Sequence, residues 1–515
     1  MPGTRLLCQD AGLLEKVGRS LRRMTEAPVS TTISFSIFST RRPASPKIKR
    51  QVEPRMQDHS TESSSAPENI PDPCAFERIR TPGSIQPHGL LFILDQDLVI
   101  LQVSENCGHI LQRDASSVIG SRVLDLVTPE CAPKVEVLVR DAASTFVNPF
   151  RVSIAVGRDL RRFDGIAHAV QDDRFVLELE PATDGPEDGL ERYLDVVQRS
   201  LTLVAEETGI SGFADVMARE IKWFTGFDRV MVYRFAPRGH GQVIAEAKEG
   251  EMDSYLGLHY PATDIPQQAR ELYLTNHVRL LQDVDAIPAR LVSRGDISGI
   301  GETDLSKAVL RSMSPVHLQY LRNMGVSASF SISLIVGKTL WGLIACHHRS
   351  PRFIPYAVRA TASLYGTVMA AQLDLLQHGQ ATMRMAVMRK GALSVLTAAQ
   401  EIEEPLERLR QMLPKLKELF AADGVMLLAG GKSWCDGATP GEATCVALTD
   451  ELSALPTRDT VISHSAGEMF PSLSGLTSIA SGMVAVSLGE FGWLVVLRGE
   501  TARRIAWAGP VDRPV

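Results

Sequence analysis

The sequence has no run of about 18 consecutive apolar residues, which is the length that a membrane-spanning helix requires. Its longest apolar stretches, such as Leu340–Cys346, have the length of buried strands. It also has no basic stripe with interleaved aromatic residues, so broad nucleic-acid binding is not expected. We therefore expect a cytoplasmic protein that uses neither a membrane nor a nucleic acid as its partner.

Cysteine is scarce and scattered. No CxxC pair and no Cys/His spacing of a metal site occurs, and the number of cysteines is odd, so neither a zinc site nor a disulfide framework is expected. This pattern is typical of a reducing compartment. The seven residues are Cys8, Cys74, Cys107, Cys131, Cys346, Cys435 and Cys445.

Charge is unevenly distributed along the 515 residues. The net charge is −6, but residues 1–55 carry eleven Lys/Arg and four Asp/Glu, which leaves +7 there and −13 in the remainder. Such a basic leader is compatible with a targeting peptide or an arm for an anionic surface. It is equally compatible with a disordered tail, or with translation that starts at Met24 or Met56. We expect residues 1–70 to be a disordered extension and linker.

The length suggests about three domains. In residues 71–190, Leu90–Leu94 and Leu98–Val103 predict a hairpin, and Phe150–Val156 and Arg174–Leu179 predict further strands of the same sheet. In residues 191–375, predicted helices and strands alternate, and the last two strands, Ser327–Val336 and Leu340–His347, are expected to pair around Gly337-Lys338. Both regions read as small α+β domains.

Helical patterning dominates from Tyr356 to Leu419, which predicts a helix long enough to join two domains. Leu364, Val368, Ala371 and Leu375 form an apolar stripe on it, and such a stripe buries against a domain or a partner helix. Residues 376–515 return to short strands with glycine-rich turns. The predicted fold is therefore α+β: three consecutive domains of antiparallel sheets flanked by helices and joined by a long helical spine.

Five short sequence motifs, taken together and in the order in which they occur, resemble those of the biliverdin-binding phytochromes of bacteria. They are PGSIQPHG (82–89), DRVMVYRF (228–235), YPATDIP (260–266), RSMSPVHLQYLRNMG (311–325) and LWGLIACHH (340–348). The resemblance covers residues 70–515. It implies a PAS domain, a GAF domain that holds a bilin and a PHY domain, and hence a red/far-red photoreceptor rather than an enzyme.

The resemblance also implies the site of covalent attachment. Cys74 lies between Pro73 and Ala75 ahead of the PAS domain, where members that use biliverdin carry the cysteine that forms a thioether with the cofactor. Attachment needs a reachable thiol with some thiolate character. Val316 and Leu318 flank His317, so the alternative attachment cysteine of plant-type members is absent. Cys346 is expected to be a small core residue.

Further residues acquire roles from their places in the strings. Asp264 resembles the aspartate whose backbone carbonyl meets the pyrrole N–H groups, and His317 the histidine that moderates chromophore protonation, for which a pKa near 6.5 is suitable. A helix N-cap is the ordinary alternative for Asp264. Arg279 and Arg311 match the arginines that bind the propionates. The remaining matches are hydroxyl donors and residues around the rotating D ring: Ser314, Ser329, Ser331, Tyr273, Tyr233, Tyr260, Tyr320 and His347.

The C-terminal part departs from complete family members. Trp493–Arg498 with Ala502–Pro514 resembles the outgoing arm of a PHY hairpin, whereas the returning arm is absent because the sequence stops at Val515. No histidine-kinase string follows, so an output kinase or another effector is expected in the parent protein. The stripe on the predicted spine makes a homodimer, parallel or antiparallel, a reasonable expectation.

Two other classes of function remain open from the residues alone. A PAS–GAF module that senses a diffusible ligand such as a cyclic nucleotide would explain the folds, but not Cys74 or the SPVH and PATDIP strings. A hydrolytic or redox enzyme using Cys74 and His317 lacks an orienting acid and an oxyanion hole at recognisable spacing.

Overall fold

The structure is a computed structural model that describes residues 77–141, 148–170, 173–182, 189–236, 239–294, 303–399, 404–455, 460–501 and 505–508. The chain folds into two compact units. Of the described residues, one unit contains those from 77 to 377 and 505–508, and the other contains those from 378 to 501. Each unit is described by itself.

A seven-stranded antiparallel sheet forms the first domain, in the order β1-β11-β3-β2-β6-β5-β4. The predicted hairpin and both further strands are confirmed, but the twelve-residue β5, which pairs with β4 and β6, was missed. Its first four residues are all exposed, which hides the alternation that signals a strand. The strands are β1 (Ser84–Ile85), β2 (Leu90–Leu94), β3 (Ile100–Ser104), β4 (Phe150–Val156), β5 (Asp159–Val170), β6 (Arg174–Pro181) and β11 (Ala289–Ser293).

Short helices complete the first domain beside this sheet, and Val135 and Val139 of α4 pack in its core with Phe92 and Leu177. The helices are α2 (Cys107–Leu111), α3 (Ala115–Val118), the 3-10 helix η2 (Val123–Asp125) and α4 (Ala132–Arg140).

The first sheet includes a strand contributed by the second domain. β11 begins only at Ala289, yet it pairs with β1 on one side and with β3 on the other. Ile85 of β1 also bridges to Arg311. Ile85, Leu91, Val176, Ala289 and Leu310 share a buried apolar cluster. The first two domains are therefore packed into one unit by interleaved strands.

The second domain is built on a six-stranded antiparallel sheet in the order β10-β12-β13-β7-β8-β9. Gly337, at φ +61, provides the left-handed turn between β12 and β13, where the sequence predicted it. The strands are β7 (Arg229–Phe235), β8 (Gly241–Lys248), β9 (His259–Tyr260), β10 (Val278–Leu281), β12 (Ala328–Val336) and β13 (Thr339–His348).

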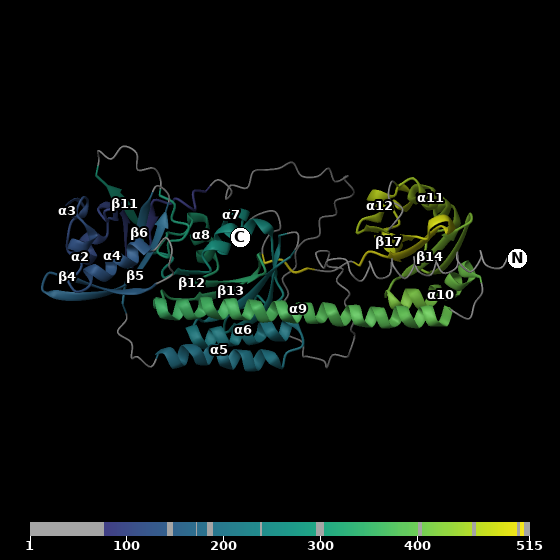
Figure 1. The fold of residues 1–515 in the computed structure, drawn as a ribbon, viewed down its shortest axis with the longest axis horizontal. Coiled ribbons are helices and arrows are strands. Elements are labelled where there is room, and N and C mark those ends of the chain that lie inside the picture. The colour runs from purple at the N-terminus through teal and green to yellow at the C-terminus, as the bar shows by residue number, and fades with distance from the viewer. Residues whose placement is uncertain are drawn as a thin grey trace. The chain divides into compact units, whose positions relative to one another are not determined.

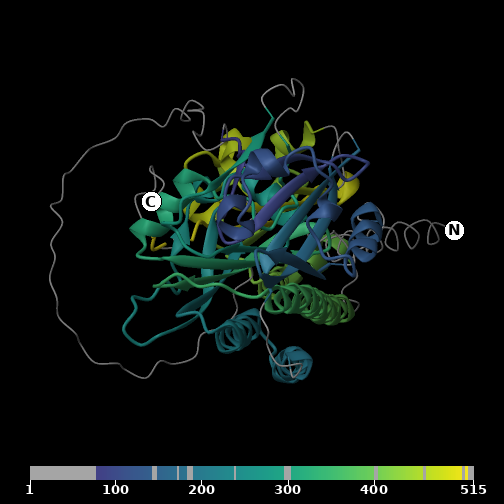
Figure 2. The ribbon, with the colours of Figure 1, turned by 90° about the vertical axis from the view of Figure 1, so that its left-hand side faces the viewer.

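Helices cover both faces of this second sheet. On one face Phe330 and Ile332 pack with Met217, Tyr365 and the other core residues of α5, α6 and α9, three helices that run side by side (Figures 1 and 2). Cys346 is fully buried in this core, as expected. The helices are α5 (Gly189–Ala205), α6 (Ile210–Thr225), η4 (Ala262–Asp264), α7 (Gln267–Thr275), α8 (Pro315–Asn323) and α9 (Tyr356–Ala399).

The predicted spine is confirmed as α9, which has 44 residues and so extends about 66 Å along its axis. Tyr365, Met369 and Leu373 form its buried face. The stripe named from the sequence lies elsewhere on the helix: Leu364 is 52% exposed and Leu375 is 65% exposed. Val368 of the stripe packs against the core, whereas Leu364 and Leu375 are available for contacts outside this chain.

The third domain has a five-stranded antiparallel sheet in the order β15-β14-β18-β17-β16. Alternate residues of β14 face opposite helices: Met426 packs with α11, and Leu427 packs with α10. The elements are α10 (Pro405–Leu419), β14 (Gly424–Ala429), β15 (Lys432–Gly437), α11 (Glu442–Ser453), β16 (Thr460–Ser463), α12 (Ala466–Met469), η5 (Pro471–Leu473), α13 (Thr477–Ala480), β17 (Gly482–Ser487), η6 (Gly489–Phe491) and β18 (Trp493–Arg498).

The fold class predicted from the sequence is thus confirmed, with three antiparallel sheets flanked by helices. Among the residues with described positions, no helix combines the length and the apolar character needed to cross a membrane.

Candidate functional site

A cavity of about 200 Å³ lies in the second domain, bordered by the central strands of its sheet and by α7 and α8. Cys74 lies outside the described residues. The other twelve residues singled out from the sequence all line this one cavity: Tyr233, Tyr260, Asp264, Tyr273, Arg279, Arg311, Ser314, His317, Tyr320, Ser329, Ser331 and His347.

The sheet forms one wall of the cavity, because successive side chains of a strand point to opposite faces and alternate ones share a face. Ser329 and Ser331 are two residues apart on β12, so their side chains share a face. Ser329 is opposite His347 of β13, and Ser331 is opposite Arg279 of β10. Three strands therefore present these four polar side chains to the same space.

Arg279 is buried, with 6% of its surface exposed, and is held in a fixed orientation. Its Nε donates to Ser331 Oγ at 2.9 Å, and its Nη1 donates to Asn276 O at 2.7 Å and to Ser333 Oγ at 2.8 Å. The guanidinium lies 3.9 Å from the centre of the Tyr273 ring. Nη2 has no partner. Burial lowers the pKa of Arg279 to about 10, so it stays protonated at neutral pH with one nitrogen available to a ligand.

Arg311 approaches the cavity from the segment that precedes α8. Its Nη1 donates to Ile79 O at 2.7 Å, while its buried Nε has no partner. Burial lowers its pKa from the ordinary value. Ser314 caps α8 by accepting from His317 N, and its hydroxyl donates to Glu77 Oε2 at 2.6 Å. The N-terminal segment thus contacts both Arg311 and the start of α8.

The Asp264 side chain lines the cavity, and neither of its buried carboxylate oxygens has a hydrogen-bond partner. Burial raises its pKa to about 6. The N-cap interpretation is wrong, because Pro266 occupies the cap position of α7 and no side chain caps that helix. The acid is therefore left free for a ligand or for another residue.

The two histidines of the cavity are neutral at pH 7. Burial, followed by the positive charges of Arg279 and Arg311, lowers the pKa of His317 to about 4. Burial, followed by Arg229, lowers the pKa of His347 to about 3. The pKa near 6.5 considered for His317 is thus corrected for the cavity as it stands. A bound anion between the two arginines would offset their charge and raise the value.

Aromatic rings form the far end of the cavity. Tyr233 lies 5.8 Å from Tyr260 and 5.2 Å from Phe235, measured between ring centres, and its buried hydroxyl has no partner. Tyr320 stacks on His317 at 6.3 Å. Rings packed on one side with an unpaired hydroxyl on the other suit a ligand that is itself flat and polar at its edge.

Part of the expected outgoing arm lies beside these rings. Ala506 O accepts from His259 N at 2.8 Å, and Ala508 N donates to His259 O at 2.9 Å. The Trp507 ring lies 5.9 Å from the His259 ring, and Ala508 packs in the cluster of Tyr233 and Tyr260.

Two residues that position the site were missed. Ser333 continues the alternation of Ser329 and Ser331 and accepts from Arg279, so the pattern in the sequence could have identified it. Arg270 donates to the carbonyls of Ala262 and Ile265, at 3.1 and 2.7 Å, and thereby fixes the backbone on both sides of Asp264. No local pattern marks that role.

The unpartnered polar atoms fit one kind of ligand. Arg279 Nη2 and Arg311 Nε suit carboxylates, both Asp264 oxygens suit N–H donors, and a neutral imidazole accepts or donates one hydrogen bond. A flat molecule with two carboxylates, several N–H groups and a terminal carbonyl satisfies all of them. A linear tetrapyrrole has this set of groups.

Comparisons with known proteins place the chain in a family. The PAS fold family matches residues 74–182, the GAF domain matches 210–372 and the phytochrome region matches 389–515. Cyanobacterial phytochrome B of Nostoc sp. is 33% identical over 446 residues, covering 86% of this chain and 59% of the relative. A bacteriophytochrome of Xanthomonas campestris is 34% identical over 460 residues, covering 85% and 70%. The chain therefore spans less than two thirds of the Nostoc protein.

Solved structures show the same similarity. The bacteriophytochrome crystal structure from R. palustris has a TM-score of 0.76 at 32% identity, covering 86% of this chain and 89% of that one. The chromophore-binding domain of a Stigmatella aurantiaca phytochrome has a TM-score of 0.55 at 40% identity, covering 58% of this chain and 98% of that one. By sequence, by fold and by the residues gathered in its cavity, the chain belongs to the bacteriophytochromes of the phytochrome family.

Proposed function

We propose that this chain is the photosensory core of a red/far-red light receptor that holds biliverdin in its GAF cavity, attached to Cys74. The observation that carries the proposal is the convergence of Arg279, Arg311, Asp264 and His347, each with a buried polar atom that has no partner, around one cavity that His317 also lines. Bound biliverdin would supply absorption of red light and isomerisation of a methine bridge.

The two arginines would bind the two propionates. Both guanidinium groups are buried, so their attraction for a carboxylate is less screened by water than at the surface. Ser331, Ser333 and Asn276 already use three of the N–H groups of Arg279, which leaves the Nη2 group to face a ligand. Tyr273 stacks on that guanidinium and keeps it flat against the cavity wall.

The acid and the histidines would control the protons at the centre and the end of the ligand. The Asp264 carbonyl and carboxylate would accept from pyrrole N–H groups, and neutral His317 can accept a further proton. His347 of β13, which lies opposite Ser329 of β12, would donate to the terminal carbonyl. Tyr233, Tyr260 and Tyr320 would form the wall around the ring that rotates.

Chain length supports attachment at Cys74. Glu77 and Ile79 line the cavity, and Cys74 precedes Glu77 by three residues. Three extended residues span about 10 Å, so the thiol can reach the cavity rim.

The spine would carry the signal and the contacts to other chains. Leu364 and Leu375 on α9 are exposed apolar residues that a second copy of the helix would cover. We include in the proposal a homodimer through α9, an output kinase or other effector in the parent protein, a cytoplasmic location and the absence of enzymatic activity in this module.

The deciding experiment combines absorption with denaturing zinc fluorescence. Wild type, Cys74→Ser and the control Cys435→Ser, which removes an exposed thiol of the third domain, are each mixed with biliverdin and illuminated with red light. We expect a red band with a light-induced difference in all three, and loss of the covalent adduct in Cys74→Ser alone. Label that persists in Cys74→Ser would overturn the attachment site. A colourless wild type would overturn the proposal and favour a diffusible ligand.

A further inference from the structure

Two glutamates on β6 are buried between the first and second domains. Glu178 and Glu180 are two residues apart, so both face away from the first-domain core that Leu177 and Leu179 enter. Their exposed fractions are 0% and 1%. Burying a carboxylate costs free energy unless it is hydrogen-bonded or paired with a cation, so each must have partners.

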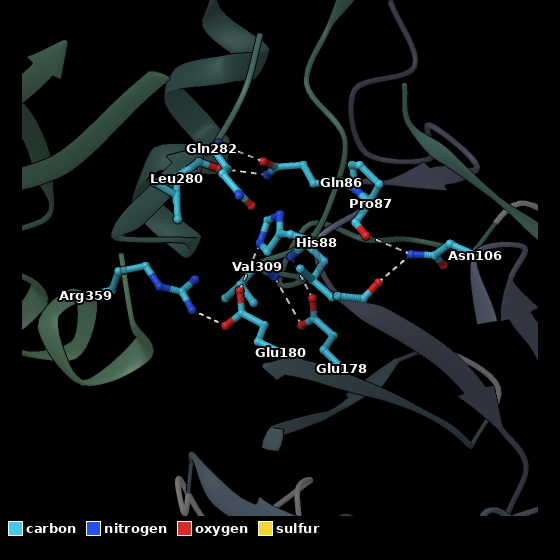
Figure 3. Close-up of polar contacts among 12 residues, drawn as sticks. Gln86, Pro87, His88, Asn106, Glu178, Glu180, Leu280, Gln282, Val309 and Arg359 are labelled. Carbon is cyan, nitrogen blue, oxygen red and sulfur yellow. Dashed lines mark hydrogen bonds and ion pairs between the residues drawn. The ribbon is translucent and has the colours of Figure 1, made fainter. Parts of the chain in front are cut away.

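Glu178 binds the backbone directly before Arg311. Its Oε1 accepts from Val309 N at 3.1 Å and its Oε2 accepts from Leu310 N at 2.7 Å (Figure 3). Leu310 O accepts in turn from Gln86 N at 2.7 Å. The segment that presents Arg311 to the cavity is therefore held on one side by β6 and on the other by the strand region around β1.

Glu180 binds the first turn of α9. Its Oε2 forms an ion pair with Arg359, the fourth residue of α9, and its Oε1 lies 3.2 Å from His88 Nε2 (Figure 3). The Arg359 side chain is 4% exposed. Burial raises the pKa of Glu180, but Arg359 and His88 outweigh this effect and hold the pKa below its usual value, so Glu180 is ionised at neutral pH.

β6 is a stiff connection between these two sets of contacts. Residues 175–179 of β6 pair with β2 on one side, and the whole of β6 pairs with β5 on the other. Residues two apart on a strand are separated by about 7 Å, so the two carboxylates cannot move independently. Burial raises the pKa of Glu178 to about 8, so Glu178 is largely protonated at neutral pH, whereas Glu180 is ionised. Leaving the charge of Glu180 or the hydrogen-bonding groups of Glu178 without partners in the interior is costly, which favours discrete arrangements over gradual deformation.

We propose that Glu178 and Glu180 are positioning residues that couple the Arg311 end of the cavity to the first turn of α9 through β6. The inference rests on the proposed function, in which Arg311 binds the ligand and α9 carries the signal. A displacement of Arg311 changes the Val309–Leu310 backbone, Glu178 follows it, and Glu180 transmits the shift to Arg359. This route passes through the first domain and bypasses the sheet that holds the cavity.

The test uses the biliverdin-loaded chain, the double variant Glu180→Gln/Arg359→Gln and four single variants: Glu178→Gln, Glu180→Gln, Arg359→Gln and Glu136→Gln. The last is the matched control, because Glu136 is an exposed carboxylate on α4 paired with Arg140. Two quantities are measured, the dark absorption band and the light-minus-dark change in amide hydrogen exchange of the first turns of α9.

The coupling predicts the following results for the variants. Glu180→Gln keeps the dark band, because Glu180 does not touch the cavity, and reduces the light-induced exchange difference in α9 by about threefold or more. Arg359→Gln does the same, and the double variant is no worse than either single variant. Glu178→Gln shifts the dark band as well, since it releases the backbone before Arg311. Glu136→Gln changes neither quantity.

The contrary results are equally distinct. If Glu180→Gln raises exchange in α9 equally in dark and light and leaves their difference intact, the pair is merely structural and the coupling is refuted. If Glu180→Gln does not fold, Arg359→Lys is measured in its place, because it keeps the charge but changes its geometry. The light-minus-dark difference in the exchange of α9 then tests the coupling in the same way. A wild type that takes up no biliverdin overturns the proposed function and this inference with it, whereas a photoactive wild type whose variants keep the full difference overturns this inference alone.

Discussion

Replacing Arg279 with lysine tests how the cavity recognises a carboxylate. Nε and Nη1 of Arg279 are already committed to Ser331, Asn276 and Ser333, and Nη2 alone is unpartnered. A single ammonium cannot hold the same protein groups and also reach the ligand. The burial that lowers the pKa of Arg279 to about 10 would also favour a neutral lysine. Losing one charge-assisted hydrogen bond costs about 1.5–3 kcal/mol, or about 10- to 100-fold in Kd.

The measurement is made in a Cys74→Ser background so that binding is reversible. Biliverdin is titrated while the red absorption band is followed, and Arg279→Lys is expected to raise Kd by about 10- to 100-fold. Arg322→Lys is the control, because Arg322 lies on α8 in an exposed pair with Asp285. A Kd for Arg279→Lys within about twofold of the background, with Arg322→Lys equal to it, would refute the assignment of Arg279 to a propionate.

Three other predictions follow from single contacts. Burial raises the pKa of Asp264 from 3.8 to about 6, so the ligand-free protein loses stability as the pH rises from the lower value to the higher one. Asp264→Asn should therefore raise the Tm at pH 8 and change it much less at a pH near 3.8, and equal shifts at both would contradict this. A methyl group at Gly241 would overlap the Tyr233 ring, so Gly241→Ala should alter the absorption band of the loaded protein, and an unchanged spectrum would show that Tyr233 does not contact the ligand. Leu364→Glu with Leu375→Glu should convert a dimer to a monomer in analytical ultracentrifugation while photoconversion survives; a persistent dimer would exclude this face of α9.

Local signals in the sequence were sufficient for most of the elements. β4 has the predicted bounds, and the helix from Tyr356 follows from a long stretch with few breakers. The alternation of Ser329 and Ser331 identified their shared face, because side-chain direction in a strand depends on neighbouring residues alone. β5 was missed because its hydrophobic pattern begins only at Phe163.

Features that depend on contacts between segments far apart in the chain could not be predicted from local sequence patterns. Periodicity showed a stripe at Leu364 and Leu375 on α9, but which face of a helix is buried depends on what packs against it, and the structure buries Tyr365 and Met369 instead. The role of Arg270 beside Asp264 depends on a backbone turn that brings Ala262 and Ile265 around one guanidinium.

By itself the sequence determined the order of the three domains and twelve of the residues that share the cavity, since those depend on local patterns and on strings whose resemblance is specific. Only the tertiary structure decided that β11 enters the sheet of the first domain, that Glu178 and Glu180 are buried between domains, and that His317 is neutral. Those facts depend on burial and on charges brought together from far along the chain. The free energy of a charged group depends on how deeply the group is buried, and burial cannot be inferred from a short stretch of sequence.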